Sequence, residues 1–411
     1  MSTKFNQQLL SDLPSGWMAS LLDSLTIRGS GHTPDKAFSE YYNGGIKWVS
    51  LADSYRLDDG MIFETDFEIS ELGIKKSSAV IHPIGTVIMS RDAGVGKSAI
   101  IGTDMAVSQH FITWTCKKAL DNWFLYYWLQ YHKGYFERQA VGSTIKTIGL
   151  PLFKKLLIKH PDYLEQKAIS KFLCEWDKAI KKTNKLINQK QNRKQWLIHQ
   201  LLTGKKRLKG FTHQWNKITY DDVLSIVKRR INWDDSKLYN LISVKRRSGG
   251  IFLREALHGH KILVKNLCLV EEGDFLFSKM QILHGASALV TKEFTNTYIS
   301  GSYIAVVAKD EQLLNMNYFN WYSQLPYFYH QTYISSYGVH IEKMTFDFEN
   351  FLSLGLTLPT IEEQIEINKV LKTADKEIQL LKAKAAKLQE QKKGIMQLLL
   401  TGKKRLKTET T

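Results

Sequence analysis

The sequence predicts a mixed α/β fold, in which two α/β globular domains are separated by two long α-helices that form an antiparallel coiled coil with pseudo-two-fold symmetry. Three observations support this prediction. At 411 residues, the chain is too long for one ordinary hydrophobic core. The nonapeptide "LLTGKKRLK" occurs twice, as Leu201–Lys209 and as Leu399–Lys407, 198 positions apart. The segments before both copies have helical apolar periodicity, whereas the rest alternates short apolar runs with turn residues.

The repeat extends well beyond these nine residues. An ungapped alignment of the chain with itself at the same offset matches Trp17 with Trp215, Pro161 with Pro359, Glu165-Gln166 with Glu363-Gln364, Asp177 with Asp375 and Lys194 with Lys392. Self-similarity at a fixed offset indicates duplication of a structural unit. The chain therefore consists of two half-units of about 200 residues, each ending in a basic segment.

Each basic segment is predicted to be one long helix. Asp162 with Glu165, and Thr360 with Glu363, have the spacing of a capping box, and a proline precedes each predicted cap. About 40 helical residues span roughly 60 Å at 1.5 Å per residue. These segments give the predicted domains: 1–160 and 210–358 are globular, while 161–209 and 359–411 are the two helical segments.

An apolar seam runs along both predicted helices. In the second helix it includes Ile367, Leu371, Ile378 and Leu388, and in the first it is interrupted at Thr183, Lys190 and Lys194. Alternating spacings of three and four residues are typical of a coiled coil, so each helix needs a partner, and the nearest candidate is its own copy. Each helix is expected to stop at a left-handed glycine, Gly204 or Gly402.

Positive charge is concentrated in the two predicted helices. The formal charge of the chain is +17, and the segments Tyr163–Lys209 and Ile361–Lys407 carry +10 and +6 of it. A basic protein attracts nucleic acid through phosphates. The alternative interpretation is a pair of lysine-rich, solvated helix faces.

Cysteine content and hydropathy predict a cytoplasmic protein. The three cysteines, Cys116, Cys174 and Cys268, are odd in number and are not spaced as zinc ligands. The first residues lack the pattern of a secretory signal, and no run of about 18 apolar residues is present. We therefore expect no disulfide framework, no metal site and no membrane segment.

The motifs in the sequence do not indicate catalysis. "GVGKS" at Gly94–Ser98 has Arg91 where a phosphate-binding loop needs its first glycine. The carboxylates in "PDYLEQK" are already explained by helix capping. The seven prolines are never adjacent, which excludes the catalytic motif of an adenine methyltransferase, and the twelve histidines form no metal-binding pattern. No catalytic residue is predicted.

Basic residues beside turns of both globular domains are the candidate DNA contacts. Arginine can bond guanine bidentately, and both basic residue types can hold phosphates. The candidates are Arg28, Lys47, Arg91, Lys97 and Lys146 in the first domain, and Lys228, Arg229, Arg230, Lys245, Arg246, Arg247, Arg254 and Lys279 in the second.

This organisation resembles the specificity subunit of type I restriction–modification systems over nearly the full chain. The motifs that carry the resemblance are "LPSGW" at Leu13–Trp17, "LPTIEEQIEI" with its weaker copy "HPDYLEQKAI", and "QLLTGKKRL" with "LLLTGKKRL". Within the globular domains, "GSGHTPDKAFSEYYNGGIKWVS" and "KRRSGGIFLRE" with "GDFLFSKMQILHGA" look like two kinds of target-recognition domain. His160-Pro161 replaces the usual Leu-Pro.

The resemblance implies a non-catalytic subunit that binds double-stranded DNA. Each target-recognition domain would read one half of a bipartite target, with the spacing set by the helices. Two modification (methyltransferase) subunits and two restriction (ATP-dependent translocase and nuclease) subunits would be its partners. S-adenosylmethionine, ATP and Mg would belong to those partners, and this chain itself would bind no cofactor. Because the two domains differ, we expect an asymmetric target.

Two other functions fit parts of the sequence. A coiled-coil scaffold or adaptor, whose globular domains bind proteins, would also explain the lysine-rich helices. Duplex binding distinguishes the two, because a scaffold would enrich no sequence from a random pool. A self-contained restriction–methylation enzyme would need the catalytic motifs that are missing.

Overall fold

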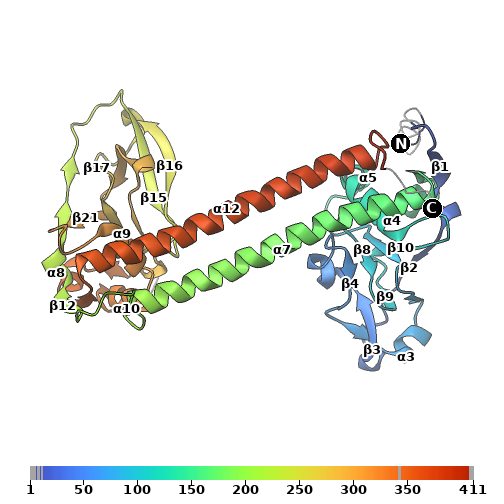
Figure 1. Ribbon diagram of the computed structural model, residues 1–411, viewed down its shortest axis with the longest axis horizontal. Helices are drawn as coiled ribbons and strands as arrows, with labels where there is room; N and C mark the ends of the chain where they lie inside the picture. The colour runs from blue at the N-terminus through green and yellow to red at the C-terminus, as the bar shows by residue number, and fades with distance from the viewer. Residues whose placement is uncertain (1–5, 7–9, 11–12, 341–343, 407–411) are drawn as a thin grey trace. The chain divides into compact units, whose positions relative to one another are not determined.

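The computed structural model describes residues 6, 10, 13–340 and 344–406, and the chain forms two compact units. Unit 1 comprises Met1–Asn184 and Ala383–Thr411, and unit 2 comprises Lys185–Lys382. Two long helices, α7 (Tyr163–Leu202) and α12 (Ile361–Leu399), stand out in Figure 1. Part of each helix belongs to unit 1 and part to unit 2. Both helices match the two long helices predicted from the sequence.

Unit 1 contains two main β-sheets. The five-stranded sheet has the order β2 (Thr26–Ser30), β10 (Phe111–Cys116), β7 (Val87–Ser90), β8 (Ser98–Ile101) and β4 (Met61–Ile62). Neighbouring strands are antiparallel except β4, which runs parallel to β8. The four-stranded sheet has the order β5 (Glu68–Ile69), β3 (Tyr42–Val49), β9 (Met105–Val107) and β6 (Ile81–His82).

The helices of unit 1 are short apart from α7. They are α2 (Leu22–Leu25), α3 (Glu71–Lys75), α4 (Asn122–Tyr131), α5 (Lys133–Gln139) and α6 (Leu150–Lys154), with 3₁₀ turns at Ser39–Tyr41 and Leu51–Tyr55. The aromatic helix α4 begins where the Asp121 side chain accepts the N–H of Phe124, as an N-cap residue does.

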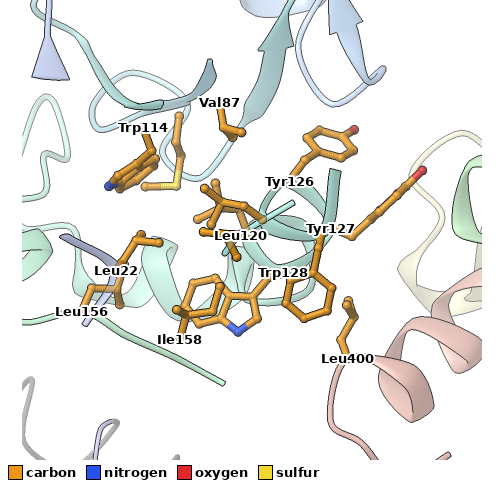
Figure 2. Close-up of a cluster of buried hydrophobic side chains, with 14 of the residues drawn as sticks. Leu22, Val87, Trp114, Leu120, Tyr126, Tyr127, Trp128, Leu156, Ile158 and Leu400 are labelled. Atoms are coloured by element: carbon orange, nitrogen blue, oxygen red, sulfur yellow. The ribbon is translucent and has the colours of Figure 1, made fainter. Parts of the chain in front are cut away.

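The core of unit 1 gathers side chains from the sheet, from α4 and from both long helices. Trp114 and Trp128 are fully buried, and Figure 2 shows them together with Leu400, which follows α12. The start of α7 contributes Ile169 and Leu173 to the same core. Burying such side chains contributes roughly 1.5–3 kcal/mol each, so the ends of both helices help to hold this unit together.

Unit 2 also contains two main sheets. The four-stranded sheet has the order β13 (Leu224–Val227), β21 (Tyr303–Ala308), β18 (Phe275–Ser278) and β19 (Ser287–Leu289). All its neighbouring strands are antiparallel, so it repeats the order and directions of β2, β10, β7 and β8. The five-stranded sheet has the order β14 (Arg229–Arg230), β17 (Leu267–Val270), β20 (Thr297–Ser300), β15 (Leu238–Val244) and β16 (Ile251–His258).

The smaller elements of unit 2 surround these sheets. They are α8 (Tyr220–Val223), α9 (Met316–Tyr322), α10 (Pro326–Ile334), α11 (Phe348–Leu352), a β22 (Ser336–Tyr337) and β23 (Thr345–Phe346) pair, and 3₁₀ turns at Gly259–Lys261, Ile282–His284 and Lys292–Phe294. The aromatic-rich helices α9 and α10 are separate, because Pro326 lacks a backbone N–H and starts a new helix at its first position.

A two-stranded ribbon ties the entry of each half to the segment before its long helix. In unit 1, β1 (Met18–Leu21) pairs antiparallel with β11 (Leu157–His160). In unit 2, β12 (Asn216–Thr219) pairs in the same way with β24 (Gly355–Leu358). The facing residues Met18 and His160 recur as Asn216 and Leu358, each displaced by 198 positions, so the duplicated frame keeps its register.

Within each unit the halves of α7 and α12 pack antiparallel. In unit 2, Lys194 of α7 bonds Asp375 of α12 at 2.5 Å, and Lys190 bonds Glu377 at 2.5 Å. In unit 1, Lys392 bonds Asp177. The lysines that interrupt the apolar seam are therefore matched by carboxylates on the opposite helix.

Both helices end as the sequence predicts. Gly204 and Gly402 have φ of +68° and +70°, in the left-handed region that favours glycine. Thr203 and Thr401 close the last turn by donating to carbonyls four residues earlier. The basic residues that follow each glycine turn back toward the start of the other long helix.

Candidate nucleic-acid interface

Both units place a predicted basic residue at the same position of the shared sheet. Arg91 directly follows β7, and Lys279 directly follows β18. The carbonyl of Arg91 accepts the N–H of Ile148 at 2.8 Å, and the carbonyl of Lys279 accepts the N–H of Phe346 at 3.3 Å. Ile148 and Phe346 are themselves 198 positions apart. The Arg91 loop (Arg91–Lys97) and the Lys279 loop (Lys279–Ala286) are therefore equivalent.

In unit 1 the Arg91 loop lies against a second loop, the Gly142 loop (Val141–Thr147). Isolated β-bridges join Thr147 to Asp92 and to Val141. A cavity of about 520 Å³ is bordered by residues of both loops, and three lysines line it: Lys97, Lys133 and Lys146. The structure thus brings together two of the five candidates predicted in this domain, Lys97 and Lys146, beside the loop that Arg91 begins.

These three lysines differ in what holds them. Lys97 donates to the carbonyl of Ser54 at 3.0 Å, and Lys133 pairs with Asp58 at 2.6 Å. Lys146 is exposed, and its ammonium has no partner among the residues that the structure describes. A phosphate placed at this cavity would therefore meet one uncommitted ammonium and two that already have partners.

Sequence reasoning missed Lys133. It follows the aromatic helix α4, far along the chain from the Arg91 loop. Gly96 packs directly on Lys133: a Cβ added to this glycine would lie only 3.0 Å from the Lys133 side chain. This packing places Lys133 beside the Arg91 loop and its cavity. The contact is tertiary, so nothing in the local sequence around Lys133 signals it.

In unit 2 a hairpin turn, the KRRSGG turn (Lys245–Gly250), joins β15 to β16 and docks on the Lys279 loop. The N–H of Arg247 donates to the carbonyl of His284 at 2.6 Å, and the N–H of Ser248 donates to that of Gly285 at 2.8 Å. The Ser248 hydroxyl lies 2.7 Å from the Tyr329 hydroxyl. The two segments that the sequence singled out separately form one surface.

The KRRSGG turn has an unusual backbone. Arg247 and Ser248 have φ of +57° and +52°, and the N–H of Gly249 donates to the carbonyl of Arg246. Two consecutive left-handed residues at the centre of a hairpin are characteristic of a type I′ turn, which favours Asn-Gly. A left-handed conformation costs most other residues roughly 1–2 kcal/mol each. Docking on the Lys279 loop offsets this strain.

The three cations of this turn are held differently. The ammonium of Lys245 lies 5.5 Å from the centre of the Phe252 ring. Arg246 donates to the side-chain carbonyl of Gln281 at 2.8 Å. The guanidinium of Arg247 is exposed and has no hydrogen-bond or ion-pair partner in the part of the chain that the structure describes. Arg247 is thus the uncommitted cation of the turn.

Several other predicted candidates are paired with carboxylates. The pairs, with their N–O separations, are Arg28 with Asp23 at 2.9 Å, Lys47 with Glu64 at 2.8 Å, Arg229 with Asp274 at 2.6 Å and Arg254 with Glu255 at 2.7 Å. Asp274 is buried, and its hydrogen bond raises the pKa of Arg229. Lys228 and Arg230 lie exposed at β14. Cations paired with carboxylates contribute to the folded structure and are less available to DNA than exposed cations without such a partner.

The predicted capping residues have a second role in the structure. The Asp162 side chain accepts the N–H of Glu165 at 3.0 Å, which caps α7. At α12, the backbone carbonyl of Thr360 accepts the N–H of Gln364 and so closes the first helical turn. The Glu165 carboxylate does not reach back to the cap, because Arg405 binds it through two hydrogen bonds. Arg207 binds Glu363 in the same way, at 2.6 Å for both bonds.

The helix pair has a groove in each unit. In unit 1 the groove is lined by Trp176 of α7 and by Ile395 and Leu398 of α12. In unit 2 it is lined by Leu197 of α7 and by Val370 and Ala374 of α12, together with three lysines and an arginine. Leu197 and Ile395 are equivalent residues, as are Ala374 and Trp176, so the two grooves occupy the same place in the repeated frame.

Two features of the described residues concern metal binding and membranes. Among residues 13–340 and 344–406, no three His, Cys, Asp or Glu side chains gather in a way that could hold a metal ion. None of the helices in the described ranges combines the length and the apolar character needed to cross a bilayer.

Comparison with known proteins gives consistent matches. The model of the type I restriction modification DNA specificity domain matches twice, at residues 14–193 and 212–390. The specificity subunit of the type I restriction enzyme MjaIX from Methanocaldococcus jannaschii is 24% identical over 67% of this chain, and the match spans 64% of that relative. The putative MjaX specificity subunit from the same organism is 25% identical over 98% of this chain and 97% of its own length.

Solved structures share the fold at low sequence identity. The S subunit of a type I system from M. genitalium superposes with a TM-score of 0.55 at 14% identity, covering 93% of this chain and 96% of that chain. The HsdS subunit from Thermoanaerobacter tengcongensis gives 0.52 at 15% identity, covering 95% and 98%. The two domain matches cover most of the chain and coincide with its two half-units. The chain therefore belongs to the type I restriction–modification DNA-specificity family and contains two copies of the domain that defines it.

Proposed function

We propose that this chain is the non-catalytic specificity subunit of a type I complex and reads an asymmetric, bipartite duplex target, one half-site per unit. The observation that supports this most directly is the shared sheet with unlike loops. Arg91 and Lys279 directly follow equivalent strands, β7 and β18. However, the Arg91 loop borders a lysine-lined cavity, whereas the Lys279 loop contacts the arginine-containing KRRSGG turn. Identical loops would read identical half-sites, and these loops differ.

The chemistry of the two surfaces suits different base contacts. The cavity beside Lys146 offers ammonium groups, which are point charges and hold phosphates. The KRRSGG turn offers guanidinium groups, whose planar forks match the acceptors of guanine. We therefore expect the two half-sites to differ in sequence and in the share of affinity that comes from the phosphate backbone.

The long helices are proposed to set the spacing between the half-sites. Both α7, with 40 residues, and α12, with 39, are uninterrupted. Matched lysine–carboxylate pairs and an apolar seam hold them together within each unit. A paired helix of fixed length can hold two reading surfaces at a fixed number of base pairs.

The duplicated frame is proposed to dock two modification subunits. A groove with a partly apolar lining is present at the equivalent place on the helix pair of each unit, with Ile395 in one and Leu197 in the other. Equivalent surfaces accept equivalent partners. Two restriction subunits would complete the complex, and S-adenosylmethionine, ATP and Mg would enter with these partners.

Selection from a random duplex pool tests this proposal. The chain, purified with its modification partner, should enrich one two-part motif with a fixed unread spacer. Binding should weaken steeply as salt rises, because phosphate contacts release counterions. A scaffold protein would enrich no sequence, and that result would exclude the proposed function.

A further inference from the structure

The KRRSGG turn of unit 2 holds an arginine in a conformation that its sequence does not favour. Arg247 and Ser248 are the two central, left-handed residues, with φ of +57° and +52°. Glycines are present at the next two positions, Gly249 and Gly250, yet not at the strained ones. Backbone strain of this kind persists where surrounding contacts over-determine it, and it clusters at functional sites.

The contacts that over-determine this turn come from two other segments. The backbone N–H groups of Arg247 and Ser248 donate to the carbonyls of His284 and Gly285 at 2.6 and 2.8 Å. The Tyr329 hydroxyl lies 2.7 Å from that of Ser248, and a Cβ at Gly285 would come within 2.3 Å of the same hydroxyl. The backbone beneath the Arg247 side chain is therefore fixed before any ligand binds.

Arg247 is also the cation of this turn that is free to bind. Its neighbours Lys245 and Arg246 are directed to Phe252 and Gln281. The Arg247 side chain is exposed and unpartnered within the described residues, and it stands beside the loop that begins at Lys279. The fixed backbone sets where this side chain starts, and its free guanidinium can present two parallel donors to a ligand.

We propose that Arg247 determines specificity by reading a guanine in the major groove of the half-site bound by unit 2. Guanine is the base that presents two acceptors, O6 and N7, side by side to a guanidinium. This inference rests on the proposed function and adds one assigned contact to it. Lys279 and Lys146, by contrast, carry ammonium groups, which are point charges suited to phosphates.

The experiment is methylome sequencing of a host that expresses the chain with its modification partner. Arg247→Asn is the main variant, because asparagine suits a left-handed turn position and the hairpin is retained. Ser248→Gly relieves strain while it keeps Arg247 and the two backbone hydrogen bonds that dock the turn. Lys309→Ala removes an exposed cation of the same unit that pairs with Asp221 and is not a candidate DNA contact. Thermal unfolding of each complex checks that the fold is unchanged.

With Arg247→Asn, one G·C position in one half-site should lose its specificity, while the other half-site stays unchanged. Discrimination at that position should fall roughly ten- to a hundred-fold. Ser248→Gly and Lys309→Ala should leave the motif unaltered. The inference is overturned if Arg247→Asn preserves every letter of the motif, or if it weakens all positions equally. If the wild-type complex itself yields no bipartite motif, the proposed function fails instead.

Discussion

The guanidinium of Arg405 donates two hydrogen bonds to the buried carboxylate of Glu165, joining the residues after α12 to the start of α7. Arg207 binds Glu363 in the same way, and each of these residues is displaced by 198 positions from its counterpart. The partners are exchanged between the two halves: the basic segment after each long helix binds a glutamate in the first turn of the other long helix. Such an exchange is the signature of an isologous interface built into a single chain.

Removing Arg405 should destabilise unit 1. Arg405→Ala removes both hydrogen bonds from the buried Glu165 carboxylate. Because the Arg405 side chain is itself 42% exposed, water can reach the vacated site, and the loss costs about 2 kcal/mol. Urea unfolding of the purified chain measures the change. Lys404→Ala, at an exposed neighbouring residue, is the matched control and should shift stability by less than about 0.5 kcal/mol. Equal stability of the Arg405→Ala and control chains would contradict this role.

The exchange predicts that a half-length chain forms a homodimer. In a fragment of residues 1–209, Arg207 of one copy should replace Arg405 against Glu165 of the other. Ile198, Leu201 and Leu202 would likewise take the places of Met396, Leu399 and Leu400 in the core. Analytical ultracentrifugation should give a dimer, and Arg207→Ala should weaken it. A monomeric fragment, or a dimer whose affinity is unchanged by Arg207→Ala, would contradict this exchange of partners.

Salt dependence should separate free cations from paired ones. Lys146→Ala should weaken binding similarly for all duplex sequences and reduce the salt slope of binding by about one phosphate contact. Lys47→Ala should change neither, because Lys47 already pairs with Glu64. Titrations of the complex at several salt concentrations check both. A change of motif with Lys146→Ala would instead make Lys146 a base contact.

Stability should fall as pH falls below 6.5. Burial lowers the pKa of His132 to about 4, so this imidazole stays neutral in the folded state while the unfolded chain takes up a proton. The free energy of unfolding therefore falls by about 3 kcal/mol as the pH falls from 6.5 to 4. Urea unfolding across this range measures the loss.

His132→Asn should flatten this pH dependence. A smaller slope of the same sign should remain, because burial also lowers the pKa of His82. The His132 prediction fails if the variant and the wild-type chain lose stability equally over this pH range.

Lengthening the helices should lengthen the spacer. Inserting four residues near Lys181 in α7 and near Leu380 in α12 adds one helical turn, about 6 Å, or roughly two base pairs. Motif selection with the modified complex gives the preferred spacer. Insertion in α7 alone is the control, since it misaligns the seam and should reduce binding. An unchanged spacer would contradict the ruler role.

Much of the frame could be predicted because its signals are local or repeated. The 198-residue offset predicted both long helices, and glycine after the last apolar position predicted their ends. The partners of Glu165 and Glu363 could not be predicted in this way. Their spacing from Asp162 and Thr360 fits a capping box, but Arg405 and Arg207 lie far along the chain and hold both carboxylates. Sequence spacing alone does not separate a local hydrogen bond from a long-range ion pair.

The candidate interface was predictable as a set of residues and not as a surface. Arg229 and Arg247 look alike in sequence, each within a short basic run. The structure pairs Arg229 with Asp274, 45 residues later, and leaves Arg247 exposed on a strained turn. Which cation is neutralised depends on strand pairing and loop docking, and these are tertiary properties without a local signal.

We propose above all that one duplicated frame presents two unlike reading surfaces. Methylome sequencing of a host that carries this chain with its modification partner tests it most directly. We expect a single asymmetric motif of two unlike half-sites, with a methylated adenine in each half and a fixed unread spacer. A contiguous palindrome, or two identical half-sites, would contradict it.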